Sequence, residues 1–143
     1  RTQAELDRQM TTPHEILNPP ALADPVGYSH VVVATPGRTI YLGGQTAHDA
    51  DNKLVGDTIA AQFDQAAANL VTALDAAGAK PEHLVSMQIF VTDVAEYKGS
   101  LDELAVAYQE HLGRHYPAIA LLEVKGLYDP AAKVELVAIA VVP

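Results

Sequence analysis

The sequence predicts an α+β domain in which a mixed β-sheet has two helices packed on one face. The first observation is the order of the patterns along the chain, which is strand, strand, helix, strand, helix, strand, strand. The second is the last strand pattern, Val134 to Val142, in which both faces are apolar beyond Glu135. The helices of a chain this size cover one face of a sheet, so we expect another subunit to cover the other face.

Composition limits the classes of protein and partner. The chain has 143 residues, 49% of them hydrophobic and 19% charged, as expected for one folded domain. The net charge of −9 argues against nucleic acid and acidic membranes as partners. The absence of cysteine excludes disulfides, thiolate catalysis and cysteine-based zinc sites. With no membrane-length apolar run and a polar start from Arg1 to Thr12, we expect a cytoplasmic protein.

We divide the chain into a leader, residues 1–17, and a single domain, residues 18–143. Arg1 to Met10 is expected to form a short frayed helix. Three prolines are expected to prevent regular structure after it, namely Pro13, Pro19 and Pro20. Two strand patterns follow, His30 to Thr35 and Thr39 to Leu42, and the turn residues between them predict a hairpin.

The middle of the chain begins with a double glycine, Gly43-Gly44, which indicates a bulge or a close approach to the backbone. After a polar loop, Thr58 or its neighbour Asp57 can cap a helix that continues until Gly78. Leu84 to Thr92 then alternates as a strand with one strongly apolar face.

The last part of the chain contains a helix pattern over about Ala95 to Leu112, ended by Gly113. Two apolar strand patterns follow, Ala118 to Val124 and Val134 to Val142. The Asp129-Pro130 turn between them predicts that these two strands pair.

Four segments, in this order, resemble the Rid family, also called YjgF-like proteins. They are GYS at 27–29, YLGGQT at 41–46, LVSMQIFVTD at 84–93 and KVELVAIAV at 133–141. The resemblance covers about Asn18 to Pro143. It implies a bacterial chorismate-mutase-like domain that assembles as a homotrimer, with the sheets forming a central barrel and small-molecule clefts between subunits. It also implies hydrolysis of reactive enamines and imines to a 2-keto acid and ammonia.

On this basis we place seven ligand-binding residues at the cleft: Tyr28, Gly43, Gly44, Gln45, Ala105, Ile119 and Val137. Three of them are apolar where the family carries polar groups. Ile119 replaces an arginine that binds the substrate carboxylate, Val137 replaces a glutamate that acts on water, and Ala105 replaces an asparagine. A charge-assisted hydrogen bond of roughly 1.5 to 3 kcal/mol is therefore missing, and we expect amino-acid-derived imines to bind poorly.

Other charged residues have two interpretations each. Glu123 is the candidate catalytic proton acceptor, or a structural group at a subunit contact. Lys125 or Arg114 could replace the missing arginine from a shifted position, or could be a solvated surface cation. Glu135 reads as a solvated edge charge.

Histidines suggest a metal site in two places, at His48-Asp49-Ala50-Asp51 and at His111 with His115. Gly113 interrupts the second pair, and the acids of the first are ordinary turn residues, so we expect no metal and no cofactor.

Two functions remain, a deaminase of enamines or imines and a non-catalytic small-molecule-binding or regulatory trimer. An enzyme needs an ionisable group in the cleft, whereas a binding module needs only shape and a few donors. The charge makes a ribonuclease the weakest alternative.

Overall fold

The structure, a computed structural model, describes residues 12–143, so the helix predicted for Arg1 to Met10 lies outside the described residues. Its elements in chain order are β1 (Glu15–Leu17), β2 (Val31–Val33), β3 (Arg38–Gln45), α2 (Ile59–Ala76), the 3-10 turn η1 (Pro81–His83), β4 (Leu84–Val91), α3 (Val94–Lys98), α4 (Leu101–Leu112), β5 (Ala118–Glu123) and β6 (Val134–Val142).

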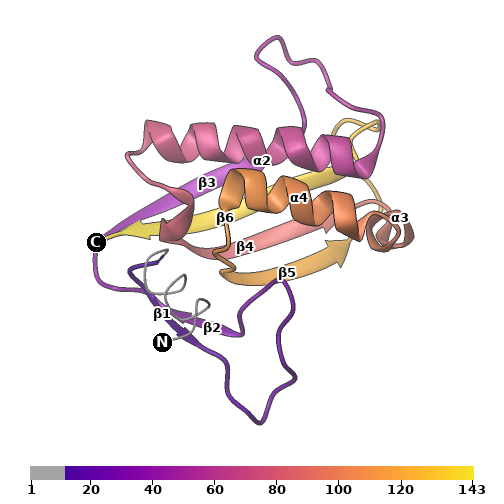
Figure 1. Ribbon diagram of the computed structural model, residues 1–143. Helices are drawn as coiled ribbons and strands as arrows, with labels where there is room; N and C mark the ends of the chain where they lie inside the picture. Colours follow the sequence, from indigo (N-terminus) through magenta and orange to yellow (C-terminus); the bar gives the residue numbers. More distant parts are fainter. Residues whose placement is uncertain (1–11) are drawn as a thin grey trace.

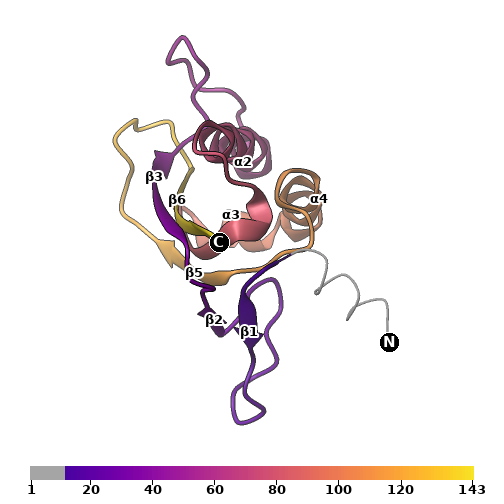
Figure 2. The same ribbon diagram turned by 90° about the vertical axis from the view of Figure 1, so that its left-hand side faces the viewer.

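The main sheet has the strand order β3-β6-β4-β5. β6 is antiparallel to both of its neighbours, while β4 and β5 are parallel. Each parallel crossover contains helix, and α2 and α4 lie on the same side of the sheet (Figures 1 and 2). The predicted α+β fold, a mixed sheet with helices on one face, is confirmed.

The sequence of β6 is apolar on both sides because the strand lies inside the sheet, between β3 and β4. Leu136 and its alternate neighbours are fully buried against the helices, and Val137 and Ile139 on the opposite face are half-buried. The face away from the helices also carries exposed apolar groups, because Tyr41 is 79% and Leu122 is 41% exposed. The two apolar faces are as predicted, and the cover from another subunit remains a prediction.

The first predicted helix has the expected ends. The Thr58 hydroxyl accepts the Ala61 N–H at 3.1 Å, and Gly78 has a φ of +72°. The second helix was predicted as one piece, and this is wrong. The chain leaves helical geometry at Ser100, which has a φ of −121°, so that α3 and α4 are separate helices.

Both predicted hairpins are wrong. β2 pairs with β1, and β3 pairs with β6 instead of β2. The prolines flank β1 without interrupting it, and His14 anchors it, because its Nε2 donates to the Val141 carbonyl at 3.0 Å. β5 pairs with β4 rather than with β6, because β6 lies between β3 and β4.

Within residues 12–143, none of the helices combines the length and the apolar character needed to cross a bilayer.

Candidate functional site

A pocket of about 670 Å³ opens beside β5, on the helix side of the sheet. It is formed by the loop before β2, the edge of the sheet and the helices α3 and α4. The residues that line it are Val26, Gly27, Tyr28, Phe63, Ile89, Val94, Tyr97, Lys98, Leu101, Leu104, Ala105, Tyr108, Tyr116, Ile119 and Leu121. This volume lies within the usual range for sites that bind small organic molecules.

Aromatic rings form one wall of the pocket. Four of the six tyrosines of the chain line it. Tyr108 and Tyr116 stack with their centroids 4.9 Å apart, and Phe63 lies 6.5 Å from Tyr108 on a nearly parallel plane. The Tyr108 hydroxyl donates to the His115 carbonyl at 2.6 Å, which fixes the ring. The wall is therefore a fixed aromatic surface suited to a flat or apolar ligand.

The ionisable side chains of the pocket lining limit the charge of a ligand that it would favour. Burial raises the pKa of Tyr97 and of Tyr108 above the ordinary value, so both phenols are neutral hydrogen-bonding groups. Of the described residues that line the pocket, only Lys98 is charged, and it is exposed at the end of α3. The pocket therefore favours a neutral ligand or one with a negative group near Lys98.

Three of the predicted ligand residues meet at this pocket. Tyr28 comes from the loop before β2, where its ring contacts His30 edge-on at 5.2 Å between centroids. Ala105 comes from the exposed side of α4, and Ile119 comes from β5. Segments from three parts of the chain thus place these residues in one cavity.

The other four ligand residues, Gly43, Gly44, Gln45 and Val137, lie elsewhere, on β3 and β6. A bulge there places both glycines opposite Val137 alone, because the register shifts between Leu42 and Gln45. None of these four residues lines the pocket within the single chain.

The bulge has a carboxylate beside it. A methyl group added to Gly44 would lie 2.5 Å from Oε1 of Glu135, so this glycine allows the close approach of that side chain. Glu135 shares the face of β6 that carries Val137. The structure thus replaces the interpretation of Glu135 as a solvated edge charge with a half-buried group beside Gly44.

Glu123, the candidate proton acceptor, lies outside the pocket lining. Its Oε1 accepts the N–H of Val94 at 2.9 Å, which ties the end of β5 to the start of α3. Lys125 and Arg114 are exposed, and neither lines the pocket.

Comparison with known proteins gives concordant results. The profile of the family described as Endoribonuclease L-PSP matches residues 19–142. YyfB of Yersinia pestis, a Rid-family protein of unknown function, superposes with a TM-score of 0.82 at 30% identity, over 90% of this chain and 98% of that one. A 2-iminobutanoate/2-iminopropanoate deaminase from Bos taurus is 32% identical over 115 residues, 80% of this chain and 79% of the bovine one.

The chain belongs to the Rid family. A further relative, Protein DfrA of Myxococcus xanthus, is 32% identical over 119 residues, 80% of this chain and 84% of that protein.

For a Rid-family chain, the lining of the pocket adds residues that sequence reasoning missed. Tyr97, Lys98 and Tyr116 lie at the pocket with Ile119, and none was singled out from the sequence. Tyr97 fits the helical spacing of the Leu101 and Leu104 pattern, so the missed signal was present. No pattern in the sequence marked Lys98, because only the folded arrangement places it at the same pocket as Ile119.

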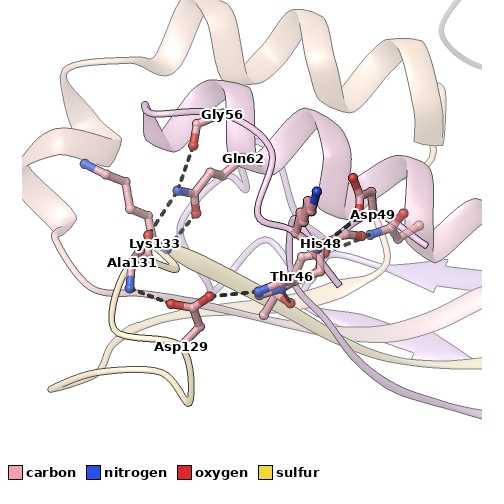
Figure 3. Close-up of polar contacts among 10 residues, drawn as sticks. Thr46, His48, Asp49, Gly56, Gln62, Asp129, Ala131 and Lys133 are labelled. Carbon is pink, nitrogen blue, oxygen red and sulfur yellow. Dashed lines mark hydrogen bonds and ion pairs between the residues drawn. The ribbon is translucent and has the colours of Figure 1, made fainter. Parts of the chain in front are cut away.

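The histidines considered for a metal site have other partners. His48 bonds to Thr46 and Asp129 (Figure 3). His111 lies on the outer surface of α4, where its Nε2 is 2.8 Å from Asp64 and close to Glu110. His115 is buried and donates to the Leu84 carbonyl at 2.7 Å, so His111 and His115 do not form a pair. We interpret the His111 group as a side-chain hydrogen bond between α4 and α2.

Proposed function

We propose that this Rid-family chain is a hydrolytic deaminase of imines or enamines, with its site completed between subunits. The observation that carries the proposal is the position of Lys98, which lines the same pocket as Ile119, where the family resemblance expects an arginine. A lysine ammonium is a point charge without the two-pronged geometry of a guanidinium, so it binds a carboxylate less selectively.

Assembly supplies the second half of the proposed site. Gly44 and Val137 lie at the β3 and β6 side of the sheet, and the pocket lies at β5, the opposite edge. A second copy whose β3 side approaches the β5 edge would bring the two groups together. The exposed apolar face with Tyr41 and Leu122 supports such packing, because its burial stabilises assembly by about 25 cal/mol per Å².

The chemistry then follows from the groups that meet. Water adds to the carbon of the C=N bond while Glu135, beside Gly44, takes a proton from it. The nitrogen receives this proton from Glu135, the C–N bond breaks, and ammonia leaves with the proton of the new hydroxyl group as the carbonyl group forms. Lys98 binds the negative end of the substrate, and the tyrosine wall packs against its apolar part.

The test is a coupled assay in which an amino-acid oxidase generates imines from aliphatic and aromatic amino acids. Carbonyl release is compared with and without the protein. We expect acceleration, with the larger effect for aromatic imines because the wall is aromatic. Lys98→Ala should raise KM roughly tenfold, the lower end expected for an exposed charge-assisted hydrogen bond. Lys53→Ala, at an exposed lysine outside the pocket lining, is the matched control.

Glu135→Gln should lower kcat with little change in KM if Glu135 takes the proton. Acceleration on no imine of the panel would contradict the proposal and favour the non-catalytic binding trimer, which the apolar residues Ile119 and Val137 also fit. Acceleration that Lys98→Ala leaves unchanged would refute the role of Lys98 alone.

A further inference from the structure

A row of three hydrogen-bonded side chains lies outside the pocket. The Thr46 hydroxyl is 2.6 Å from Nδ1 of His48, and Nε2 of His48 is 2.9 Å from Oδ2 of Asp129 (Figure 3). Thr46 and His48 follow β3, whereas Asp129 lies in the loop between β5 and β6. A hydroxyl, an imidazole and a carboxylate in this order form the arrangement that activates a hydroxyl nucleophile.

The contacts suit both protonation states of the imidazole. In the neutral ring, the Thr46 hydroxyl donates to Nδ1 and Nε2–H donates to Asp129. After proton transfer, Nδ1–H donates to the Thr46 oxygen, and Asp129 still accepts from Nε2–H. The Ala131 N–H, and then His48, lower the pKa of Asp129, which keeps the carboxylate charged to stabilise the imidazolium. The proton therefore moves without rearrangement of the three side chains.

Neighbouring groups fix this row in place. Asn69 of α2 donates to the carbonyls of Thr46 and His48 at 2.9 and 2.8 Å. The Ala131 N–H holds Oδ1 of Asp129 at 2.9 Å, so that Oδ2 faces His48. Such support is what a preorganised catalytic group requires.

A tie between the two loops does not require the Thr46 contact. The bond from His48 to Asp129 already ties the two loops together. Thr46 is two residues from His48 on the same loop, so its hydroxyl adds no further link between loops. Thr46 is half-buried, and the side chains of His48 and Asp129 are 19% and 36% exposed, so the row is partly open to solvent.

We propose that Thr46, His48 and Asp129 form a second chemical site, in which the Thr46 hydroxyl accepts an acyl group from a small activated ester or thioester. Its Oγ1 bonds to the carbonyl carbon as the hydroxyl proton passes to Nδ1 of His48. The bond from the carbonyl carbon to the leaving oxygen or sulfur breaks, and the leaving group takes that proton. Water then attacks the acyl-threonine, releases the carboxylic acid and restores the hydroxyl.

The experiment uses the full chain with 4-nitrophenyl acetate and measures two quantities. Release of 4-nitrophenolate gives the rate, and mass spectrometry of acid-quenched peptides locates the acetyl group. We expect acetylation at Thr46 and a rate above that of the buffer alone. Thr46→Val should lower the rate at least tenfold and remove the label, whereas Thr46→Ser should retain both. Thr72→Val removes a hydroxyl bonded only to a helix carbonyl and should change nothing.

The roles of His48 and Asp129 are tested by His48→Gln and by Asp129→Asn, each of which should lower the rate at least tenfold. Circular dichroism checks that each variant is folded, and Thr46→Val tests the proposal even if His48→Gln fails to fold. Acetyl groups only on lysines, or an unchanged rate in Thr46→Val, would overturn the proposal. Lys98→Ala should leave this reaction unchanged, which separates it from the deaminase.

Discussion

Gln62 of α2 offers the sharpest test of how side-chain hydrogen bonds fix the segments before α2 and before β6. Its side chain is buried, with 1% exposed, in the first half of α2. Its Nε2 donates to the carbonyls of Gly56 and Ala131 at 3.2 and 3.1 Å, and its Oε1 accepts the N–H of Lys133 at 2.7 Å (Figure 3). Gln62→Leu keeps the volume of the side chain and leaves three backbone groups without this partner.

The expected loss follows from these three bonds. Each contributes about 0.5 to 1.5 kcal/mol net, so the free energy of unfolding should fall by roughly 3 kcal/mol. For a chain of this size that corresponds to a fall in Tm of roughly 10 °C. The measurement is urea unfolding at one fixed protein concentration, because the stability of a protein that self-associates depends on its concentration.

Gln109→Leu is the matched control, because the exposed amide of Gln109 makes only a 3.4 Å contact with Tyr116. It should change the free energy of unfolding by less than about 0.5 kcal/mol. A loss below about 1 kcal/mol in Gln62→Leu, with the denaturant slope unchanged, would refute the reasoning from the three bonds.

Three further predictions concern stability and assembly. Burial lowers the pKa of His115 below its ordinary value of 6.5, so the unfolded chain takes up a proton that the folded chain excludes. The contribution of His115 to the free energy of unfolding should be constant above that pH and should fall as pH decreases below it, by up to about 1.4 kcal/mol per pH unit. The urea midpoint of His115→Gln should therefore depend less on pH than that of the unchanged protein. Tyr108→Phe removes the donor to the buried His115 carbonyl and should cost about 1 kcal/mol in urea unfolding, whereas Tyr128→Phe, at a fully exposed ring, should cost nothing. Tyr41→Glu places a charge on the apolar sheet face and should dissociate the assembly in sedimentation, and an unchanged mass would contradict a subunit contact there.

The fold was predictable where one residue type decides the local structure. Thr58 begins the first helix and Gly78 follows its end, as expected, because a capping side chain and a left-handed glycine each act on the backbone of neighbouring residues. Strand pairing was not predictable, because alternation assigns faces but not neighbours. The strand at Glu15–Leu17 was missed for a related reason: proline excludes its own position from a sheet but not the residues between two prolines.

The candidate site was predictable in part. The resemblance placed Tyr28, Ala105 and Ile119, and the structure brings these three to one pocket. Sequence reasoning could not find Lys98 or the contact between Glu135 and Gly44, because both depend on how separate elements pack. The Thr46 row was equally hidden, since Asp129 is 81 residues from His48.

The edge position of β5 has a consequence for how the protein reaches its working state. Beyond the single bridge from Ala118 to Ser29, no strand of the described residues pairs with the outer side of β5. Its sequence, AIALLE, is apolar with one terminal charge, which is typical of strands that join to other chains. A single copy of this chain therefore presents an exposed apolar strand edge to other chains. In the assembly proposed above, correct subunit pairing and aggregation would compete for the same strand, so the yield of assembled protein would depend on how quickly the copies meet.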